Sequence, residues 1–408
     1  MRTGAKVAVA LGAAVLGVAA PVAFVAQGAG APGRADSPEL WWERVRRAPE
    51  PVLASPERAS AVQAGGIPVA RVEVKAKVEE TRRLPVQSPV VAIAGYGEAY
   101  SELLAAATFD DGVFVLEQGG TVHRVEGVQA VNALAFGLTG DLVIASDDGA
   151  FVVEPGGRVA RKVASGAFSA VAVMDGVWLA GRSGLVRLGF ASRSITRWGP
   201  DQGVRLSQPT SLAKCGERDL CAGSVDGLRK FRLGPQPSEP EDCDQCQNAI
   251  GTPAPGHLSE VAVKASLPEP FVTAVARNAW EETPAVTWAG TFGGGLVRLG
   301  GSAPLTPLDG LPEGRVNPRA LAVMNGQVYA GTPAGLLVVS DAQVFARTSY
   351  ASLVPKGRTA ALVPAGGEVM AVAPSGYGGV WLGLPGKVVR MSVEFPSEPS
   401  ALAQSRNP

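Results

Sequence analysis

The chain repeats itself about every forty residues, and this repeat limits the possible folds more than any other feature. Each copy has a short apolar strand that ends in Ala, a small turn with Gly, and a second apolar strand. Seven copies align on Ala107, Ala145, Ala180, Ala222, Ala289, Ala330 and Ala371. The intervals between these alanines are 38, 35, 42, 67, 41 and 41 residues, so five of the six lie near 40. Such a period predicts the blades of a β-propeller.

Each unit can be divided into four short strands. In the sixth unit, residues 318–324 are expected to form the inner strand, followed by 327–333, 335–341 and an outermost strand at 343–349. Val, Leu, Ile and Phe occur in runs of four to eight residues, which Gly, Pro, Asn and Asp interrupt. The sequence therefore predicts an all-β fold, a seven-bladed β-propeller over about 88–395. The remaining 396–408 are expected to be a disordered tail.

Two ways of assigning strands to the last blade, called frames here, can close the propeller ring. In the first, which we favour because it keeps the 41-residue interval, the whole seventh blade comes from 359–395. In the second, VWLGLPGKVVRM is matched to WAGTFGGGLVRL, so the C-terminus supplies three strands. Residues 70–78, ARVEVKAKV, alternate apolar and polar side chains as a strand does, and in the second frame they supply the fourth strand.

The N-terminus predicts export. Arg2 and Lys6 precede an unbroken apolar run from Val7 to Ala26. Twenty residues in a helix would cross a hydrocarbon core of about 30 Å. Residues 1–31 are therefore expected to be a signal anchor, or a signal peptide that is cleaved near Ala29-Gly30-Ala31. The positive flank places the propeller outside the cytoplasm, anchored to the inner membrane with the propeller in the periplasm, or periplasmic or secreted after cleavage.

Two further segments differ from the repeats in composition. Residues 32–87 are rich in Pro, Ala and charge and are expected to form a stalk, apart from the strand at 70–78. The 67-residue interval exceeds the usual 41 by 26 residues, and the surplus falls at about 234–259. Long insertions in repeat proteins are surface loops that often lie on a binding face.

One copy of the repeat resembles a known family. WAGTFGGGLVRL at 288–299 resembles the repeat of two-component-regulator propellers, whose core reads roughly W-x-G-T-x-x-G-G-L-x-R. Residues 177–188 and 328–339 are weaker copies, and the resemblance covers about 90–395. It implies an extracytoplasmic sensor or ligand-binding propeller, of the kind usually joined to a transmembrane helix and a histidine kinase. No kinase-like segment follows the repeats before Pro408, so a propeller without a kinase module is expected.

The four cysteines predict disulfides. Cys215 and Cys221 flank the turn between the first two strands of the fourth blade, and Cys243 and Cys246 form CDQC in the insertion. In an exported protein an even number of cysteines indicates bridges, and we expect Cys215 to pair with Cys221 and Cys243 with Cys246. Pairing between the hairpin and the insertion, a zinc site of four thiolates, and a redox CxxC remain alternatives.

Residue types that carry catalysis are scarce. The two histidines, His123 and His257, are expected on an outer strand and in the insertion, which leaves little basis for a Ser-His-Asp triad. The acidic pairs Asp110-Asp111 and Asp147-Asp148 fall at hairpin turns, where Asp caps its own backbone. The tryptophans, which include Trp178, are expected to pack between blades. The sequence therefore indicates no catalytic, cofactor-binding or metal-binding residues and no cofactor.

Composition and charge limit the partners. Lys plus Arg and Asp plus Glu are 37 each, so nothing favours nucleic acid as a partner. We expect a non-enzymatic scaffold that binds an envelope protein or polymer through one propeller face and meets the membrane through its N-terminal helix. A sensory partner of a separate membrane kinase, and a propeller lyase or hydrolase, are the alternatives.

Overall fold

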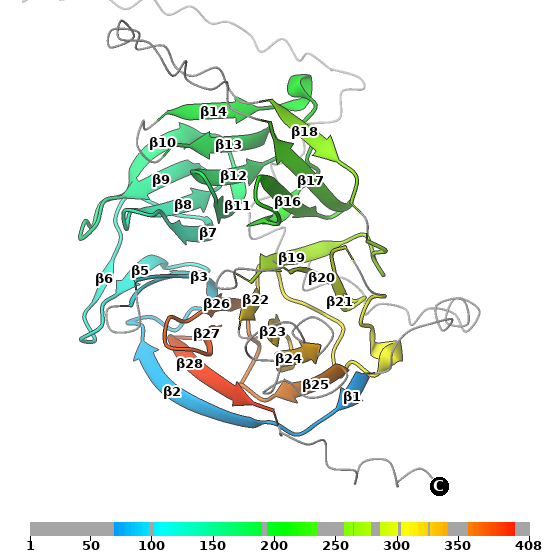
Figure 1. Cartoon of the computed structure of the whole chain (residues 1–408). Coiled ribbons are helices and arrows are strands. Elements are labelled where there is room, and N and C mark those ends of the chain that lie inside the picture. Colours follow the sequence, from blue (N-terminus) through cyan, green and yellow to red (C-terminus); the bar gives the residue numbers. More distant parts are fainter. Residues whose placement is uncertain are drawn as a thin grey trace, which may run out of the picture.

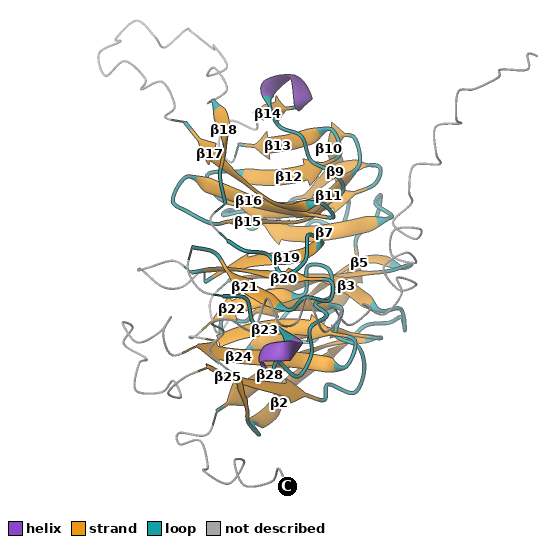
Figure 2. Ribbon diagram, turned by 90° about the vertical axis from the view of Figure 1, so that its right-hand side faces the viewer, coloured by secondary structure: helices purple, strands orange, loops and turns teal. Residues whose placement is uncertain are grey.

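The computed structural model describes residues 69–97, 102–189, 194–234, 257–263, 265–278, 286–300, 303–324, 327–341 and 358–395. These residues form seven separate sheets, and apart from the 3-10 turns η1 (Pro200–Gln202) and η3 (Pro307–Asp309) the elements are all strands (Figure 2). The innermost strands of successive sheets lie beside one another, and the last lies beside the first. The seven-bladed β-propeller predicted from the repeat is confirmed.

Six of the blades follow the chain in order. From the axis outward, blade 1 consists of β3 (Val90–Tyr96), β4 (Leu103–Thr108), β5 (Gly112–Leu116) and β6 (Val122–Arg124). Blade 2 consists of β7 (Val131–Phe136), β8 (Leu142–Ser146), β9 (Gly149–Val153) and β10 (Arg161–Ser165). Blade 3 consists of β11 (Phe168–Val173), β12 (Val177–Gly181), β13 (Gly184–Leu188) and β14 (Ile195–Trp198). Blade 4 consists of β15 (Pro209–Lys214), β16 (Asp219–Ser224), β17 (Gly227–Leu233) and β18 (Leu258–Val261). Blade 5 consists of β19 (Val272–Arg277), β20 (Thr287–Thr291) and β21 (Leu296–Arg298). Blade 6 consists of β22 (Leu321–Met324), β23 (Gln327–Thr332), β24 (Gly335–Asp341) and β25 (Arg358–Val363).

Blade 7 closes the ring with both ends of the propeller sequence. Its inner three strands are β26 (Ala371–Pro374), β27 (Val380–Leu384) and β28 (Lys387–Glu394). Its outermost strand is β2 (Lys75–Arg83), which runs antiparallel beside β28 (Figure 1). The short strand β1 (Val69–Arg71) joins blade 6 in parallel with β25.

The frame that we favoured for ring closure is therefore wrong. Residues 359–363 belong to β25, the fourth strand of blade 6, because they pair with β24. The expected outermost strand of that blade, 343–349, lies outside the described residues. Ala371 is on the innermost strand of blade 7, opposite Gly383, whereas the other six alanines of the repeat are on second strands. The strand expected at 70–78 is split into β1 and β2, and both lie before the expected start of the propeller at 88.

Tryptophan side chains pack where adjacent blades meet. Trp178, Trp288 and Trp381 occupy equivalent places on the second strands of blades 3, 5 and 7, and each is at most 1% exposed. Trp178 packs among residues of blades 3 and 4, and it stacks on Trp198 with 5.0 Å between ring centroids. The predicted packing of Trp between blades is confirmed for these side chains.

The predicted disulfide between Cys215 and Cys221 is present at the turn between β15 and β16. Cys243 and Cys246 lie outside the described residues, within the insertion that joins β17 to β18. Of the alternatives, a zinc site that uses all four thiolates is inconsistent with the bonded pair. No cluster of three or more His, Cys, Asp or Glu suited to a metal occurs among the described residues.

The hairpin disulfide should contribute modestly to stability. It closes a loop with a sequence separation of only 6 residues. The chain-entropy model gives roughly 2 kcal/mol for so short a loop. We expect the double variant Cys215→Ala/Cys221→Ala to lose about that free energy of unfolding in urea titrations. The matched variant Cys243→Ala/Cys246→Ala should lose less, and non-reducing peptide mapping should recover the 215–221 bridge in it. Free Cys215 and Cys221 thiols in the wild type would contradict the pairing.

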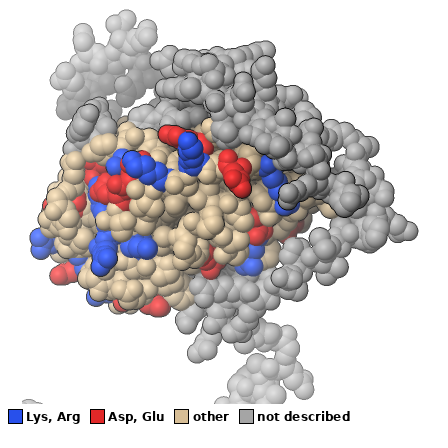
Figure 3. Space-filling model, turned by 90° about the horizontal axis from the view of Figure 1, so that it is seen from below, with Lys and Arg blue, Asp and Glu red and all other residues tan. Residues whose placement is uncertain are grey.

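The surface and the termini add two observations. Figure 3 shows Lys and Arg interspersed with Asp and Glu, with wide areas of other residues between them. Among the residues that the structure describes, no helix has the length and apolar character needed to cross a membrane. The predicted segment from Val7 to Ala26 and most of the predicted stalk lie outside those residues.

Candidate axial site at the mouth of the channel

The inner strands begin with an irregularity that shapes one end of the central channel. In blades 2 to 5 the pairing between first and second strands shifts register at the second residue of the first strand. The shifted residues are Asn132, Ser169, Thr210 and Thr273. In blade 1 the same shift falls at the apolar Val91. Bulges of this kind redirect side chains and often border functional sites. The mouth thus has a polar sector formed by blades 2 to 5.

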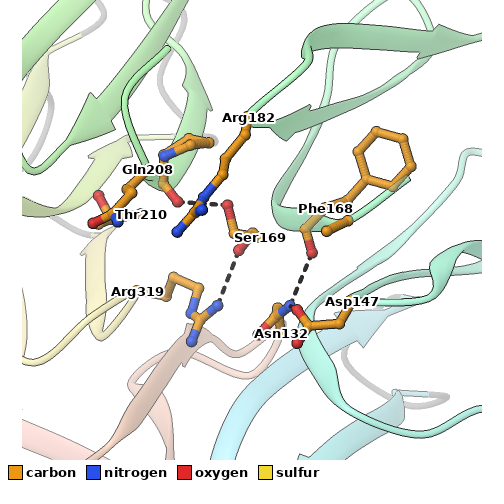
Figure 4. A pocket seen from close by; sticks show the side chains of 10 residues that line it. Asn132, Asp147, Phe168, Ser169, Arg182, Gln208, Thr210 and Arg319 are labelled. Atoms are coloured by element: carbon orange, nitrogen blue, oxygen red, sulfur yellow. Dashed lines mark hydrogen bonds between the residues drawn. The ribbon is translucent and has the colours of Figure 1, made fainter. Parts of the chain in front are cut away.

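A pocket lies in this polar sector. It has a volume of about 80 Å³, and it draws side chains from blades 2, 3 and 4 and from the loop before β22. Its lining residues are Asn132, Asp147, Ala167, Phe168, Ser169, Arg182, Gln208, Pro209, Thr210 and Arg319. Figure 4 shows Arg182 on one side of Ser169 and Arg319 on the other. We call this the mouth pocket.

Arg319 joins opposite sides of the ring. It precedes β22 of blade 6, and its Nη1 donates a hydrogen bond to the Ser169 carbonyl oxygen of blade 3 at 2.9 Å. Arg319 also lines a second cavity of about 130 Å³, whose other walls come from the inner strands of six blades. Its guanidinium therefore lies between the mouth pocket and the central channel. Burial lowers the pKa of Arg319 to about 10, and the Asp147 carboxylate opposes that shift.

Asp147 is the acidic group of the pocket. Burial, together with the charge of the neighbouring Asp148, raises the pKa of its carboxyl group, while a hydrogen bond from Asn132 and the charges of Arg319 and Arg182 act in the opposite direction. Asn132 Nδ2 donates both to Asp147 Oδ1 at 2.8 Å and to the Phe168 carbonyl oxygen at 3.0 Å. Asn132 thereby fixes the carboxylate against the neighbouring blade (Figure 4).

Two lining residues have a backbone conformation that L-residues rarely adopt. Gln208 has φ 46° and Arg319 has φ 62°. Such left-handed residues cost free energy, and they persist only where the surrounding structure determines them, often at ligand sites. Gln208 directly precedes β15 and Arg319 lies two residues before β22, so the left-handed backbone at both positions places their side chains at the mouth.

The mouth pocket offers polar and charged groups that can bind a ligand. Its lining includes two guanidinium groups, one carboxylate, two amides and two hydroxyls, and none of its lining residues is His, Cys, Tyr or Lys. The Ser169 hydroxyl donates to the Pro209 carbonyl oxygen, and the Thr210 hydroxyl donates to the Val272 carbonyl oxygen. A nucleophile with an adjacent base is therefore not present among the residues that line the pocket.

Most residues singled out from the sequence lie elsewhere. His123 is on β6, the outermost strand of blade 1, and His257 is directly before β18. Asp111 is at the turn between β4 and β5, where its carboxylate accepts a hydrogen bond from the Ser88 hydroxyl. Asp147 is at a turn as expected, but it also lines the mouth pocket, which the turn interpretation overlooked.

The sequence held one signal for the site. The strings VNALAF, FSAVAV, PTSLAK and VTAVAR each place a polar residue second in the inner strand. A polar residue at one fixed repeat position marks a shared axial layer. Arg182 and Arg319 come from a turn and a loop, so no periodic pattern identifies them.

No protein-family model matches this chain, and no curated protein matches it either. Solved structures show the same fold at low identity. The extracellular domain of a hybrid two-component system from B. thetaiotaomicron has a TM-score of 0.51 at 15% identity, covering 76% of this chain. This chain spans only 39% of that domain.

Two other propellers are about as similar. A streptogramin B lyase has a TM-score of 0.51 at 12% identity, with 79% of this chain and 98% of the lyase covered. The WD40 propeller domain of Doa1 has a TM-score of 0.51 at 10% identity, with 78% and 97% covered. The expected likeness to two-component propellers is confirmed at the level of the fold. Because a lyase and a WD40 domain share that fold, function has to be argued from the site.

Proposed function

We propose that this protein is a non-enzymatic, extracytoplasmic binding scaffold that engages an envelope protein or polymer through the propeller face that bears the mouth pocket. The observation that carries the proposal is the pocket itself. It gathers charged and amide side chains from blades 2, 3 and 4 around Arg319, yet its lining offers no nucleophile with an adjacent base. Blade packing alone does not require two arginines and a carboxylate at this point.

The extracytoplasmic location has three supports. The apolar run from Val7 to Ala26 follows two positive residues. The Cys215–Cys221 disulfide fits an oxidising compartment. The fold is that of an extracellular domain from a two-component system, a fold that other propellers share.

A reporter fusion tests the location. An enzyme that is active only outside the cytoplasm, fused after Pro408, should give signal in cells that express the full chain. The positive N-terminal flank should orient the segment so that everything after it is exported. Replacing the apolar residues 7–26 by a polar linker should abolish the signal. A reporter that is active only in the cytoplasm, giving signal from the same position, would contradict the proposal.

Site-specific crosslinking tests the binding function. A photoreactive residue at Arg182, on the mouth face, should yield discrete adducts with an envelope component in cells. The matched position is Arg187 on the same blade, whose Nη2 pairs with Asp175 Oδ2 at 2.9 Å near the turn between β11 and β12. Position 187 should not yield these adducts. Equal adducts from both positions, or none from any position on the mouth face, would contradict a mouth-face scaffold.

A further inference from the structure

One oxygen of the Asp147 carboxylate is available to a ligand in the mouth pocket. Asp147 is only partly buried, and its Oδ1 accepts the hydrogen bond from Asn132 Nδ2 at 2.8 Å. Its Oδ2 accepts no hydrogen bond from any described residue. Asn132 Nδ2 also donates to the Phe168 carbonyl oxygen, so both of its N–H groups are engaged and they hold the carboxylate in one orientation. Asp147 Oδ2 is therefore a fixed acceptor in the lining of the cavity.

The other polar groups of the lining complete a mixed pattern of acceptors and donors. The Ser169 hydroxyl gives its one hydrogen to the Pro209 carbonyl oxygen, so it can only accept from a ligand. Arg182 and Gln208 bring N–H groups to the same cavity. A ligand group that suits this lining has to donate to Asp147 and has to offer an acceptor as well.

The charges around Asp147 favour an uncharged ligand group. Asp148, Arg182 and Arg319 are the charged residues that act on the Asp147 carboxyl group. Together with Asp147 they are two anions and two cations, so their formal charges cancel. An ion that enters the pocket loses hydration and meets no surplus of opposite charge in return. A neutral donor loses less hydration and still gains a charge-assisted hydrogen bond to Asp147 Oδ2.

We propose that the mouth pocket binds the side-chain carboxamide of an Asn or Gln residue in a polypeptide partner, with the amide nitrogen donating to Asp147 Oδ2. This inference rests on the proposed binding function and names the partner class of that same site. A carboxamide is neutral, and it offers two N–H donors and one carbonyl acceptor on a planar group. A cavity of about 80 Å³ admits such a head group while the rest of the partner stays outside.

The lining favours a carboxamide over a sugar. Sugar rings commonly bind against an exposed aromatic ring, and the aromatic residue that lines this pocket, Phe168, is only 1% exposed. A hydroxyl group also supplies one hydrogen, so it would satisfy either Asp147 or Ser169, whereas a carboxamide nitrogen has a hydrogen for each. An envelope polysaccharide is therefore the alternative that the test has to exclude.

Titrations of the full chain, followed in the NMR spectrum of the ligand, test the proposal. The probe is N-acetylasparagine N-methylamide, and its analogues carry aspartate as the anion, diaminobutyrate as the cation, or alanine without a head group. We expect the asparagine probe to bind with a Kd of about 1 mM, and each analogue at least tenfold more weakly. Galactose represents the sugar and should also bind at least tenfold more weakly than the asparagine probe.

Two variants on the same turn separate the acceptor from the charge. Asp147→Asn keeps an oxygen for the bond from Asn132 and puts an N–H donor in place of Oδ2, so we expect the asparagine probe to bind at least tenfold more weakly. Asp148→Asn removes the same charge from the exposed neighbouring residue and should leave the Kd within about twofold. Thermal unfolding of both variants should match the wild type, which separates lost binding from lost folding.

Several results would overturn the inference. Aspartate analogue or galactose binding as tightly as the asparagine probe would do so, as would an unchanged Kd in Asp147→Asn or no binding of the probe. Equal losses in both variants would show that charge governs binding in place of the acceptor. Crosslinks from position 182 that persist in such cases would show that the scaffold function holds and that only the carboxamide assignment fails. Absence of both crosslinks and probe binding would refute both.

Discussion

Removal of residues 1–83 is expected to cost this propeller about 5 kcal/mol of unfolding free energy or more, whereas removal of 1–68 should leave its stability unchanged. The longer deletion takes away β2, which pairs with β28 along eight residue pairs from Lys75↔Glu394 to Arg83↔Lys387. Each backbone hydrogen bond contributes about 1 kcal/mol net. The loss is comparable with the whole stability of a typical domain, so the truncated chain should be largely unfolded or aggregated.

Arg82 makes β2 more than an added edge strand. Its Nη1 donates to the carbonyl oxygens of Glu102 and Leu116 in blade 1, at 3.3 and 3.1 Å. Its guanidinium lies 4.9 Å from the centre of the Trp381 ring in blade 7. Arg82 therefore joins the first and last blades, and it is only 7% exposed. Deleting it opens the ring at that joint and leaves β28 as an unpaired edge that can recruit other chains.

Urea titrations followed by tryptophan fluorescence measure the effect. An intermediate deletion of residues 1–73 removes β1 and keeps β2, so it separates the two strands. We expect a small loss for that deletion, because β1 contributes three residue pairs with β25. Equal unfolding midpoints for the deletions of 1–68 and 1–83 would show that the C-terminal strands alone close the ring.

The misassigned frame shows what repeat spacing can and cannot determine. Six of the seven blades followed from the alanines, which lie on second strands, and in blade 7 Gly383 of VWLGL takes the place that Ala180 has in VWLAG. Regular spacing then favoured the wrong seventh unit, since Ala371 lies 41 residues after Ala330 by coincidence. The better guide was side-chain chemistry. Trp381 in VWLGL corresponds to Trp178 in VWLAG, and both are buried on second strands.

The candidate site also has one part that the sequence could predict and one part that it could not. Asn132, Ser169 and Thr210 share one repeat position, so their common layer could be predicted from sequence. Arg319 could not be, because it reaches Ser169 across the ring over a sequence separation of 150 residues. Contacts across the axis depend on how seven blades close, and a repeat pattern holds only local information. The charged side chains of the mouth pocket therefore come from turns and loops, and the closure of the blades into a ring determines where these side chains lie.

Trp381 lies at the joint where the ring closes, and its substitution is expected to cause the second large loss of stability. It is fully buried on β27, within a cluster that includes Leu104 and Phe114 of blade 1. Its indole Nε1 is buried with no hydrogen-bond partner among the described residues. In contrast, Trp178 Nε1 donates to Asp175 Oδ1 at 2.9 Å. The two tryptophans occupy the same repeat position but should respond differently to substitution.

Replacing Trp381 by Ala should cost 3–5 kcal/mol, the usual range for emptying a large aromatic site in a core, and about 1 kcal/mol more for the lost contact with Arg82. Trp381→Phe keeps a ring beneath Arg82 and removes an unpaired buried donor, so it should recover most of that loss. Trp178→Phe should recover less, because it removes the hydrogen bond that Trp178 donates to Asp175 Oδ1. Urea unfolding of the four single variants, Trp→Ala and Trp→Phe at both positions, measures the comparison. A loss below about 1 kcal/mol in Trp381→Ala, or a Phe variant no better than Ala at position 381, would show that this tryptophan does not hold blades 7 and 1 together.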